Sequence, residues 1–253
     1  MTMSRRSVLG AAAMLPALAP ALAGTGDQGA PDTALFELRQ YTLRRNQRDV
    51  LATMFERYFV QPQEDVGAHV LGTFRDLNDP DRFVWMREFA NLEARKNALE
   101  RFYYGPVWKE HRTAANATIL DSDNVLLLRR VPLLAGPHGD WSSGGEIEAA
   151  IYYLGAVDTS AFLGFFDEHV EPLLAARGSR PLLRFATADV ANNFPRLPVR
   201  GDRVFVRFST RSSKSDLLPA GWRDAAPEAI LPAFMRKPER LHLAPLLHPR
   251  APV

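Results

Sequence analysis

The sequence predicts an α+β fold in which two tandem β-α-β-β-α-β halves pack against each other as one intrachain α+β barrel. Strand-like and helix-like patterns occur in the same order twice along the 253 residues. The matching segments lie about 110 to 120 residues apart, far more than the roughly 20 to 50 residues of a solenoid repeat. A stretch rich in glycine, proline and serine separates them at residues 132–145. We therefore expect one duplicated unit joined by a linker.

The first strands show the duplication most clearly. FELRQYTL at residues 36–43 aligns with IEAAIYYL at residues 147–154. Two residue types are kept in this alignment: Glu37 with Glu148, and Tyr41 with Tyr152. A row of apolar residues at helical spacing follows in each half and ends at a proline. Further matches are VWMR at residues 84–87 with VFVR at residues 204–207, and WKE at Trp108 with WRD at Trp222.

Each half has the ferredoxin-like order of strand, helix, strand, strand, helix, strand. Such a unit covers one face of a four-stranded sheet with its helices and leaves the other face open. Two open faces packed together give a barrel of about eight strands, wide enough for side chains or one small ligand. We expect the first half at residues 34–131 and the second, diverged half at residues 146–250, with a last helix that its prolines keep short or kinked.

The beginning of the chain is a predicted signal peptide. Arg5 and Arg6 precede a short apolar run, and Ala21-Leu22-Ala23 forms a small-x-small cleavage site. The paired arginines are typical of a twin-arginine signal, with a general secretory signal or an uncleaved anchor as the alternatives. We expect cleavage after Ala23, a flexible mature N-terminus at residues 24–33, and export to a bacterial periplasm.

The composition and charge of the chain indicate which classes of binding partner to expect. The chain has 31 Lys and Arg against 29 Asp and Glu, and because the predicted leader holds two of the bases, the mature chain is neutral. A neutral chain without a basic run gives no electrostatic reason to expect nucleic acid or, once the leader is removed, a membrane as partner. The absence of cysteine excludes disulfides and thiolate chemistry. Both a monomer and a homo-oligomer are compatible with these features.

Familiar catalytic motifs are missing. GTGDQG at residues 24–29 matches a dinucleotide-binding pattern, but it follows the predicted leader instead of a strand. No G-x-S-x-G or Walker loop occurs, and none of the six histidines lies in a metal-binding pattern, so we expect no metal site. His69, near a helix-to-strand passage, is a candidate base or axial ligand, with a core or capping role as the alternative.

Alternation along the first strand separates an apolar face from a polar one. Phe36 and Leu38 share one face, which we assign to the helix layer, and the other face then points into the barrel. This predicts a ligand cavity inside the barrel, with aromatic walls and one arginine for an anionic or carbonyl group. Its candidate residues are Glu37, Arg39, Tyr41, His69, Trp85, Arg87, Glu148 and Tyr152. The alternative is that these charges only pair with one another, since an unpaired buried ion costs several kcal/mol.

Three segments together resemble the NIPSNAP family of dimeric α+β barrel proteins: ELRQY at residues 37–41, the LEARKNAL segment after the third strand, and the Trp108 region. The resemblance covers most of residues 35–131, and a diverged copy extends from residue 147 to about residue 247. The sequence departs from the family pattern on the third strand, where Trp85 and Arg87 stand in place of an expected histidine and an expected aromatic residue. The wider relatives of this fold include cofactor-free monooxygenases, haem-handling enzymes and small-molecule binders.

Three functions follow as hypotheses. The first is an exported barrel that binds a small molecule, with its reaction and any cofactor unassigned. The second is a cofactor-free or haem-using oxidoreductase or monooxygenase that holds its ligand with Arg39, Tyr41 and Trp85. The third is a structural barrel whose charged residues are ion-paired filling. The fold alone does not decide between them.

Overall fold

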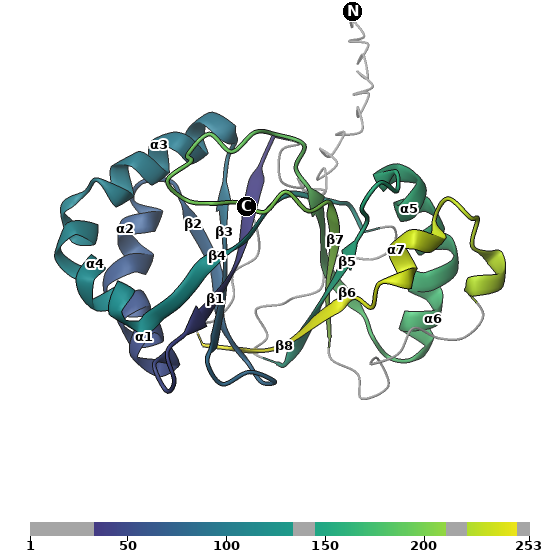
Figure 1. Ribbon diagram of the computed structural model, residues 1–253, viewed down its shortest axis with the longest axis horizontal. Helices are drawn as coiled ribbons and strands as arrows, with labels where there is room; N and C mark the ends of the chain where they lie inside the picture. The colour runs from purple at the N-terminus through teal and green to yellow at the C-terminus, as the bar shows by residue number, and fades with distance from the viewer. Residues whose placement is uncertain (1–32, 134–144, 211–221, 247–253) are drawn as a thin grey trace, which may run out of the picture.

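The computed structural model describes residues 33–133, 145–210 and 222–246 of the chain. The predicted signal peptide and most of both the mature N-terminus and the predicted linker lie outside these ranges. In Figure 1 the strands occupy the centre of the molecule, and helices from the two halves flank them on opposite sides. Within the described residues, no helix is long and apolar enough to cross a membrane.

Both halves follow the predicted order of elements. The first half consists of β1 (Leu35–Leu43), α1 (Arg48–Met54), η1 (Phe55–Phe59), α2 (Val60–Glu64), β2 (His69–Asp76), β3 (Arg82–Phe89), α3 (Leu92–Tyr103), α4 (Pro106–Thr118) and β4 (Ile119–Arg130). The second half consists of β5 (Ile147–Tyr153), α5 (Thr159–Phe165), η3 (Phe166–Val170), α6 (Glu171–Ala176), β6 (Pro181–Thr187), β7 (Val204–Thr210), η4 (Arg223–Ala225), α7 (Leu231–Met235) and β8 (Glu239–Pro245). As expected from its prolines, α7 is short.

The strands form a closed antiparallel barrel in the order β1-β3-β2-β8-β5-β7-β6-β4. Each half contributes four neighbouring strands, and the halves join where β2 pairs with β8 and β4 pairs with β6. These two seams remove the edges that each four-stranded sheet would otherwise expose. The predicted intrachain α+β barrel is therefore confirmed.

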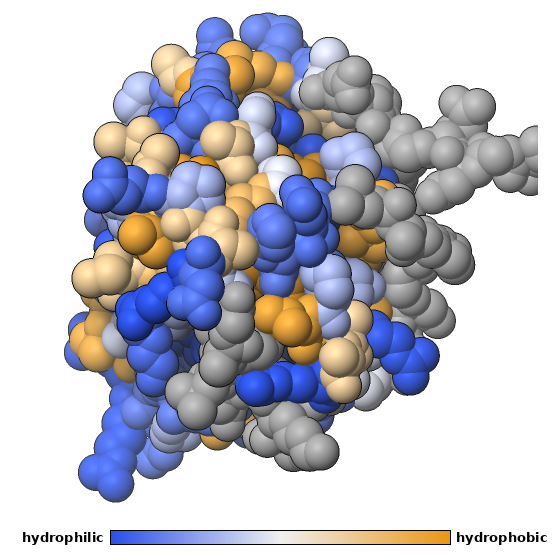
Figure 2. Space-filling view, turned by 90° about the vertical axis from the view of Figure 1, so that its right-hand side faces the viewer, coloured by the Kyte–Doolittle hydropathy of each residue, from blue (hydrophilic) through white to orange (hydrophobic). Residues whose placement is uncertain are grey.

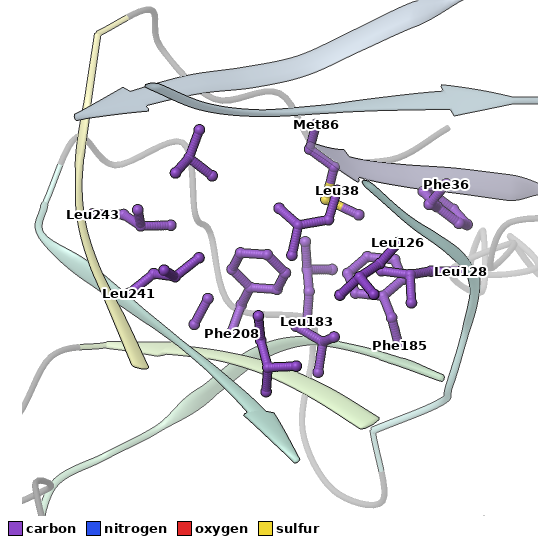
Figure 3. Close-up of a cluster of buried hydrophobic side chains, with 14 of the residues drawn as sticks. Phe36, Leu38, Met86, Leu126, Leu128, Leu183, Phe185, Phe208, Leu241 and Leu243 are labelled. Carbon is purple, nitrogen blue, oxygen red and sulfur yellow. The ribbon is translucent and has the colours of Figure 1, made fainter. Parts of the chain in front are cut away.

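The barrel interior is filled by apolar side chains from both halves (Figure 3). Phe36 and Leu38 of β1 lie in this interior, and the Phe36 ring contacts Phe185 of β6 with ring centroids 4.9 Å apart. The predicted pairing of residues into faces is correct, but the assignment of the faces is wrong, because the polar face of β1 lies toward the helices. Where two sheets pack face to face, both facing surfaces must be apolar to exclude water. A helix layer, in contrast, can also cover polar groups on the other face of a sheet.

A wide helical turn occurs at the same place in both halves. The π-helical turns η1 and η3 interrupt the first helix of each half, and in η1 the Val60 N–H bonds to the carbonyl oxygen of Phe55. Pro62 follows the end of η1 by three residues, and Pro172 follows the end of η3 by two. Proline has no N–H and its ring crowds the preceding turn, so a widened turn lets the helix continue through it. The first helix thus extends past the proline at which the sequence pattern predicts its end.

The register of the sheet corrects one part of the predicted duplication. In the first half Glu37 lies opposite Arg87, and in the second half its counterpart Glu148 lies opposite Ser209. The segments VWMR and VFVR are therefore displaced by two residues relative to the predicted alignment.

Seen from the side of the second half, the described surface mixes hydrophilic and hydrophobic residues without one broad apolar face (Figure 2).

A buried carboxylate and three arginines beside an aromatic cavity

The Glu37 carboxylate on β1 is completely buried and accepts hydrogen bonds from three arginines. Its Oε2 accepts from Arg39 Nη1 at 2.8 Å and from Arg87 Nη2 and Nε at 2.7 and 2.9 Å. Its Oε1 accepts from Arg95 Nε at 2.7 Å. Strand geometry explains the grouping, because Arg39 is two residues further along the same face and Arg87 lies directly opposite on β3. Arg95 reaches the carboxylate from α3.

This cluster carries excess positive charge. Arginine stays protonated in proteins, so three guanidinium groups face one carboxylate and leave two positive charges. Burial would raise the pKa of Glu37, but Arg87, Arg39 and Arg95 hold it well below its usual range. Within the described residues, no other carboxylate pairs with these arginines. Because buried unpaired charge is costly, the cluster favours a further anion.

The remaining partners of the arginines are neutral. Arg87 Nη1 donates to Gln63 Oε1 at 2.7 Å. Arg95 Nη1 donates to the side-chain oxygens of Asn192 at 3.1 Å and Asn193 at 2.8 Å. Amide oxygens satisfy hydrogen bonds without cancelling charge. The cluster is therefore held in place but not neutralised.

A cavity of about 350 Å³ lies beside the cluster, between the sheet and the helices of the first half. Seven of its eighteen lining residues are aromatic. The lining residues are Arg39, Tyr41, Leu51, Phe55, Phe59, Gln63, Trp85, Phe102, Tyr103, Trp108, Arg112, Thr113, Ala115, Asn116, Ile119, Ser122, Arg196 and Leu197. Among these described residues there are three arginines but no aspartate, glutamate or histidine. The volume and lining suit a small molecule with an apolar body.

Several hydrogen-bond donors at the cavity are available to a ligand. Arg39 donates through Nη1 to Glu37 and through Nε to the Tyr41 hydroxyl at 3.0 Å, which leaves Nη2 without an acceptor in the described part of the chain. Trp85 Nε1 also lacks an acceptor there, but this atom is enclosed in the cavity wall and does not reach the cavity surface. Burial raises the pKa of Tyr103, so its hydroxyl stays protonated at neutral pH and can donate. A ligand oxygen would satisfy donors whose desolvation is otherwise uncompensated.

A loop from the second half completes the site. Residues 188–203, between β6 and β7, cross to the helix side of the first half, where they appear as the green loop near α3 in Figure 1. Asn193 bonds to Arg95 and donates from Nδ2 to the Leu92 carbonyl at 2.6 Å. The Phe194 ring stacks on Tyr103 with centroids 6.0 Å apart. The cavity is thus built by both halves of the duplication.

The structure brings five of the eight predicted site residues together. Glu37, Arg39, Tyr41, Trp85 and Arg87 share one face of β1 and β3, on the helix side and not inside the barrel. Trp85 packs edge-on against Tyr41, with ring centroids 6.1 Å apart. The sequence alternation is sufficient to group them, since residues two apart on paired strands share a face.

The other three predicted residues lie elsewhere. His69 begins β2, has a side chain that is 45% exposed, and places Nδ1 2.9 Å from Glu64 Oε2. Glu148 pairs with Arg240 on the helix side of the second half. Tyr152 is buried among phenylalanines, and this burial raises its pKa to about 12. The closed barrel separates the helix-side faces of the two halves, so Glu148 and Tyr152 cannot join the Glu37 cluster.

Gln63 and Arg95 contact the cluster but are not among the predicted site residues, although their positions in the sequence indicate that they are buried. Gln63 continues the row of Leu51, Phe55 and Phe59 at a spacing of four residues, which makes it a polar residue on a buried stripe. Arg95 likewise lies on the stripe of Ala98, Leu99 and Phe102. A polar residue on an apolar helix stripe needs a buried partner. Asn192 and Asn193 lie in a long loop and carry no such signal.

In the described residues of the second half, no carboxylate gathers three arginines as Glu37 does. Ala150 stands where the first half has Arg39, and Arg207 lies opposite it. Arg207 is paired with Glu171 through its Nε at 2.9 Å and bonds to Ser179. Phe162 and Phe166 pack beside Tyr152 in the corresponding helix-side core. The duplication has therefore become asymmetric.

Residues 36–132 match the NIPSNAP family model, so the first half carries a NIPSNAP family domain. A solved structure named as a candidate monooxygenase, from Fusobacterium nucleatum, is 12% identical with a TM-score of 0.50 and covers 86% of this chain and 94% of its own. A NIPSNAP-like domain protein from Burkholderia xenovorans is 24% identical over 42% of this chain and 91% of its own, with a TM-score of 0.37. The first likeness shows the fold over most of the chain. The sequence has no match among curated proteins.

Proposed function

We propose that this chain, whose first half carries a NIPSNAP family domain, binds a small molecule with an apolar, aromatic body and an anionic group. The site is the cavity of about 350 Å³ between the sheet and helices of the first half. One observation carries the proposal: two excess positive charges are buried at Glu37, beside a cavity that no described carboxylate lines.

The anionic group is best placed at the buried end of the cavity. Arg39 lines the cavity, is only 1% exposed, and keeps Nη2 available for an oxygen. Its guanidinium lies 5.5 Å from the ring centroids of both Tyr41 and Trp85, so its orientation is set before a ligand arrives. Preorganised charge-assisted donors bind an anion more strongly than neutral donors do. Trp85, which lines the same cavity, supplies an aromatic wall beside this group.

The hypothesis that the charged residues only pair with one another and fill space explains less of this arrangement. The pairing of Glu37 with Arg39 and Arg87 agrees with that hypothesis. A cluster that only filled space would be closer to neutral, since each uncompensated buried ion costs several kcal/mol. A cluster that only filled space would also give no reason for a guanidinium to line a cavity. The charge imbalance supports a ligand.

Oxidation of the bound molecule is the alternative function at the same site. The name of the Fusobacterium nucleatum structure, a candidate monooxygenase, points that way. However, the described lining residues include no aspartate, glutamate or histidine to act as an ordinary general base. Chemistry would then depend on the ligand's own acidity, and the Arg39 guanidinium would stabilise its anion. Binding is therefore the function the site supports best.

Titration calorimetry with 2-naphthoate tests the proposal, with the neutral analogue 2-naphthalenemethanol as the matched ligand. We expect the purified full chain to bind 2-naphthoate more tightly than the alcohol. Arg39→Ala should weaken 2-naphthoate binding by about 10-fold to 150-fold, because a charged hydrogen bond contributes roughly 1.5 to 3 kcal/mol. It should change binding of the alcohol little.

Two further variants control for folding. Arg101→Ala removes an exposed arginine from α3 that does not line the cavity, and it should leave 2-naphthoate binding unchanged. Arg39→Lys keeps the charge but loses the planar fork, so its loss should be intermediate. Circular dichroism checks that each variant is folded. Equal affinity of the folded wild-type chain for acid and alcohol, or equal loss of both in Arg39→Ala, would overturn the proposal.

A further inference from the structure

The open end of the cavity carries a second positive group. Arg112 of α4 and Arg196 of the loop at residues 188–203 both line the cavity, and both are exposed. Neither forms an ion pair with a carboxylate in the described part of the chain, whereas Arg39 at the buried end is paired with Glu37. The Arg196 guanidinium lies over the Tyr104 ring, 5.2 Å from its centroid. The cavity thus has cationic groups at both its buried and its open end.

The loop that presents Arg196 is anchored to the first half on both sides of this residue. Before it, Asn193 donates to the Leu92 carbonyl at 2.6 Å. After it, the Arg200 N–H donates to the Val125 carbonyl at 2.9 Å. Within the loop, Asn192 Nδ2 donates to the Leu197 carbonyl at 2.8 Å. Arg196 is therefore held at the rim by a fixed backbone, which lowers the entropy cost of using it in binding.

Comparison of the two halves marks this loop as a special feature of the second. The equivalent connection in the first half, between β2 and β3, spans only residues 77–81, whereas β6 and β7 are joined by residues 188–203. Loops of this length without secondary structure of their own are uncommon and are usually functional. The additional residues lie against the site of the other half.

We propose that the cavity selects molecules with two anionic groups, one at each end of an apolar body, and that Arg196 with Arg112 recognises the outer group. This inference rests on the proposed function and adds the class of ligand and the residues that select it. The inner group is held at Arg39, in the buried cluster. The second half, which has Ala150 in place of Arg39, contributes selectivity to the one site in the first half.

The test compares 2-naphthoate with 2,6-naphthalenedicarboxylate, which adds a second carboxylate to the same ring system. We expect the full wild-type chain to bind the dicarboxylate about 5-fold to 20-fold more tightly, because two exposed ion pairs each contribute a small gain. The preference should shrink as salt is raised, since exposed charges are screened. Titration calorimetry at low and high salt measures both effects.

Variants at the rim separate this inference from the general charge of the protein. Arg196→Ala and Arg112→Ala should each weaken binding of the dicarboxylate about 2-fold to 5-fold more than they weaken binding of 2-naphthoate. Arg196→Glu should abolish the preference, because it replaces an attractive charge with a repulsive one, whereas Arg101→Glu, with the same change in net charge away from the cavity, should leave it unchanged. All three positions are exposed, so the four variants should unfold at the same urea concentration as the wild type.

The outcomes distinguish the two proposals. Equal affinity for both probes, together with a loss of 2-naphthoate binding in Arg39→Ala, overturns the selection of two anionic groups and leaves the proposed function intact. A preference for the dicarboxylate that survives in Arg196→Glu also overturns the role of Arg196. Absence of binding for both probes overturns the proposed function and this inference with it.

Discussion

Glu37 shows how one buried side chain can organise a site. Its two carboxylate oxygens tie together β1, β3 and α3 through Arg39, Arg87 and Arg95. Because the pKa of Glu37 in the folded chain is held below its unfolded value of about 4.3, the ionised carboxylate stabilises the fold fully above that pH. This contribution is lost as the pH falls through the unfolded pKa toward the folded one.

Glu37→Gln should therefore lower the free energy of unfolding at pH 7 by about 3 to 5 kcal/mol, because three buried guanidinium groups lose their counter-charge. Urea denaturation at pH 7 measures this change. Between about pH 5 and pH 3 the wild-type chain should lose more stability than the variant, since the variant has no carboxylate to protonate. Glu56→Gln, an exposed change on the same side of the first half, should follow the wild-type curve. Parallel acid curves for Glu37→Gln and wild type would contradict the ion-pair account.

At the scale of elements, α3 and the loop at residues 188–203 position the cluster jointly. The Asn91 side chain caps α3 by accepting from the Ala94 N–H at 2.8 Å, which fixes the start of the helix one turn before Arg95. The loop then holds Arg95 from outside through its two asparagines. A helix end and a loop from different halves thus support the same guanidinium.

Asn193→Ala should lower the free energy of unfolding by about 1 to 3 kcal/mol, because Arg95 Nη1 and the Leu92 carbonyl both lose a partner in a part-buried position. Asn97→Ala removes an exposed asparagine from α3 and should change stability by less than about 0.5 kcal/mol. Urea denaturation of both variants provides the comparison. Equal midpoints for the two would mean that the loop adds nothing to the stability of the cluster.

At the scale of the whole molecule, the closed barrel makes the halves depend on each other. Each four-stranded sheet turns an apolar face toward the other, and the seams β2–β8 and β4–β6 pair their edges. A half alone would expose this face and both edges. Soluble monomers rarely tolerate an apolar patch larger than a few hundred Å².

Residues 30–135 and 140–253, expressed separately, should accordingly fail to form stable monomers. We expect each to aggregate or self-associate, and the two together to form a one-to-one complex with the circular dichroism spectrum of the full chain. Analytical ultracentrifugation of each half and of the mixture tests this. A monodisperse, folded monomer of either half would contradict the shared-core account.

Local sequence patterns determined the order of the elements, the duplication, and the grouping of Glu37, Arg39 and Tyr41 on one strand face. Alternation and helical spacing are set by backbone geometry, so they can be recognised without knowing the partner surface. Which face turns inward is a different matter. It depends on what the other half presents, and two sheets packed together require the apolar face of β1 inside the barrel.

Only the tertiary structure therefore decided that the polar face lies under the helices, that Glu148 and Tyr152 lie apart from Glu37, and that β3 and β7 align two residues away from the predicted register. The partnership of Arg95 with Asn192 and Asn193 joins positions almost a hundred residues apart in the chain, and no local pattern encodes such a contact. The predicted leader remains a sequence prediction. The site itself arises because closing the barrel brings a loop of the second half onto the first.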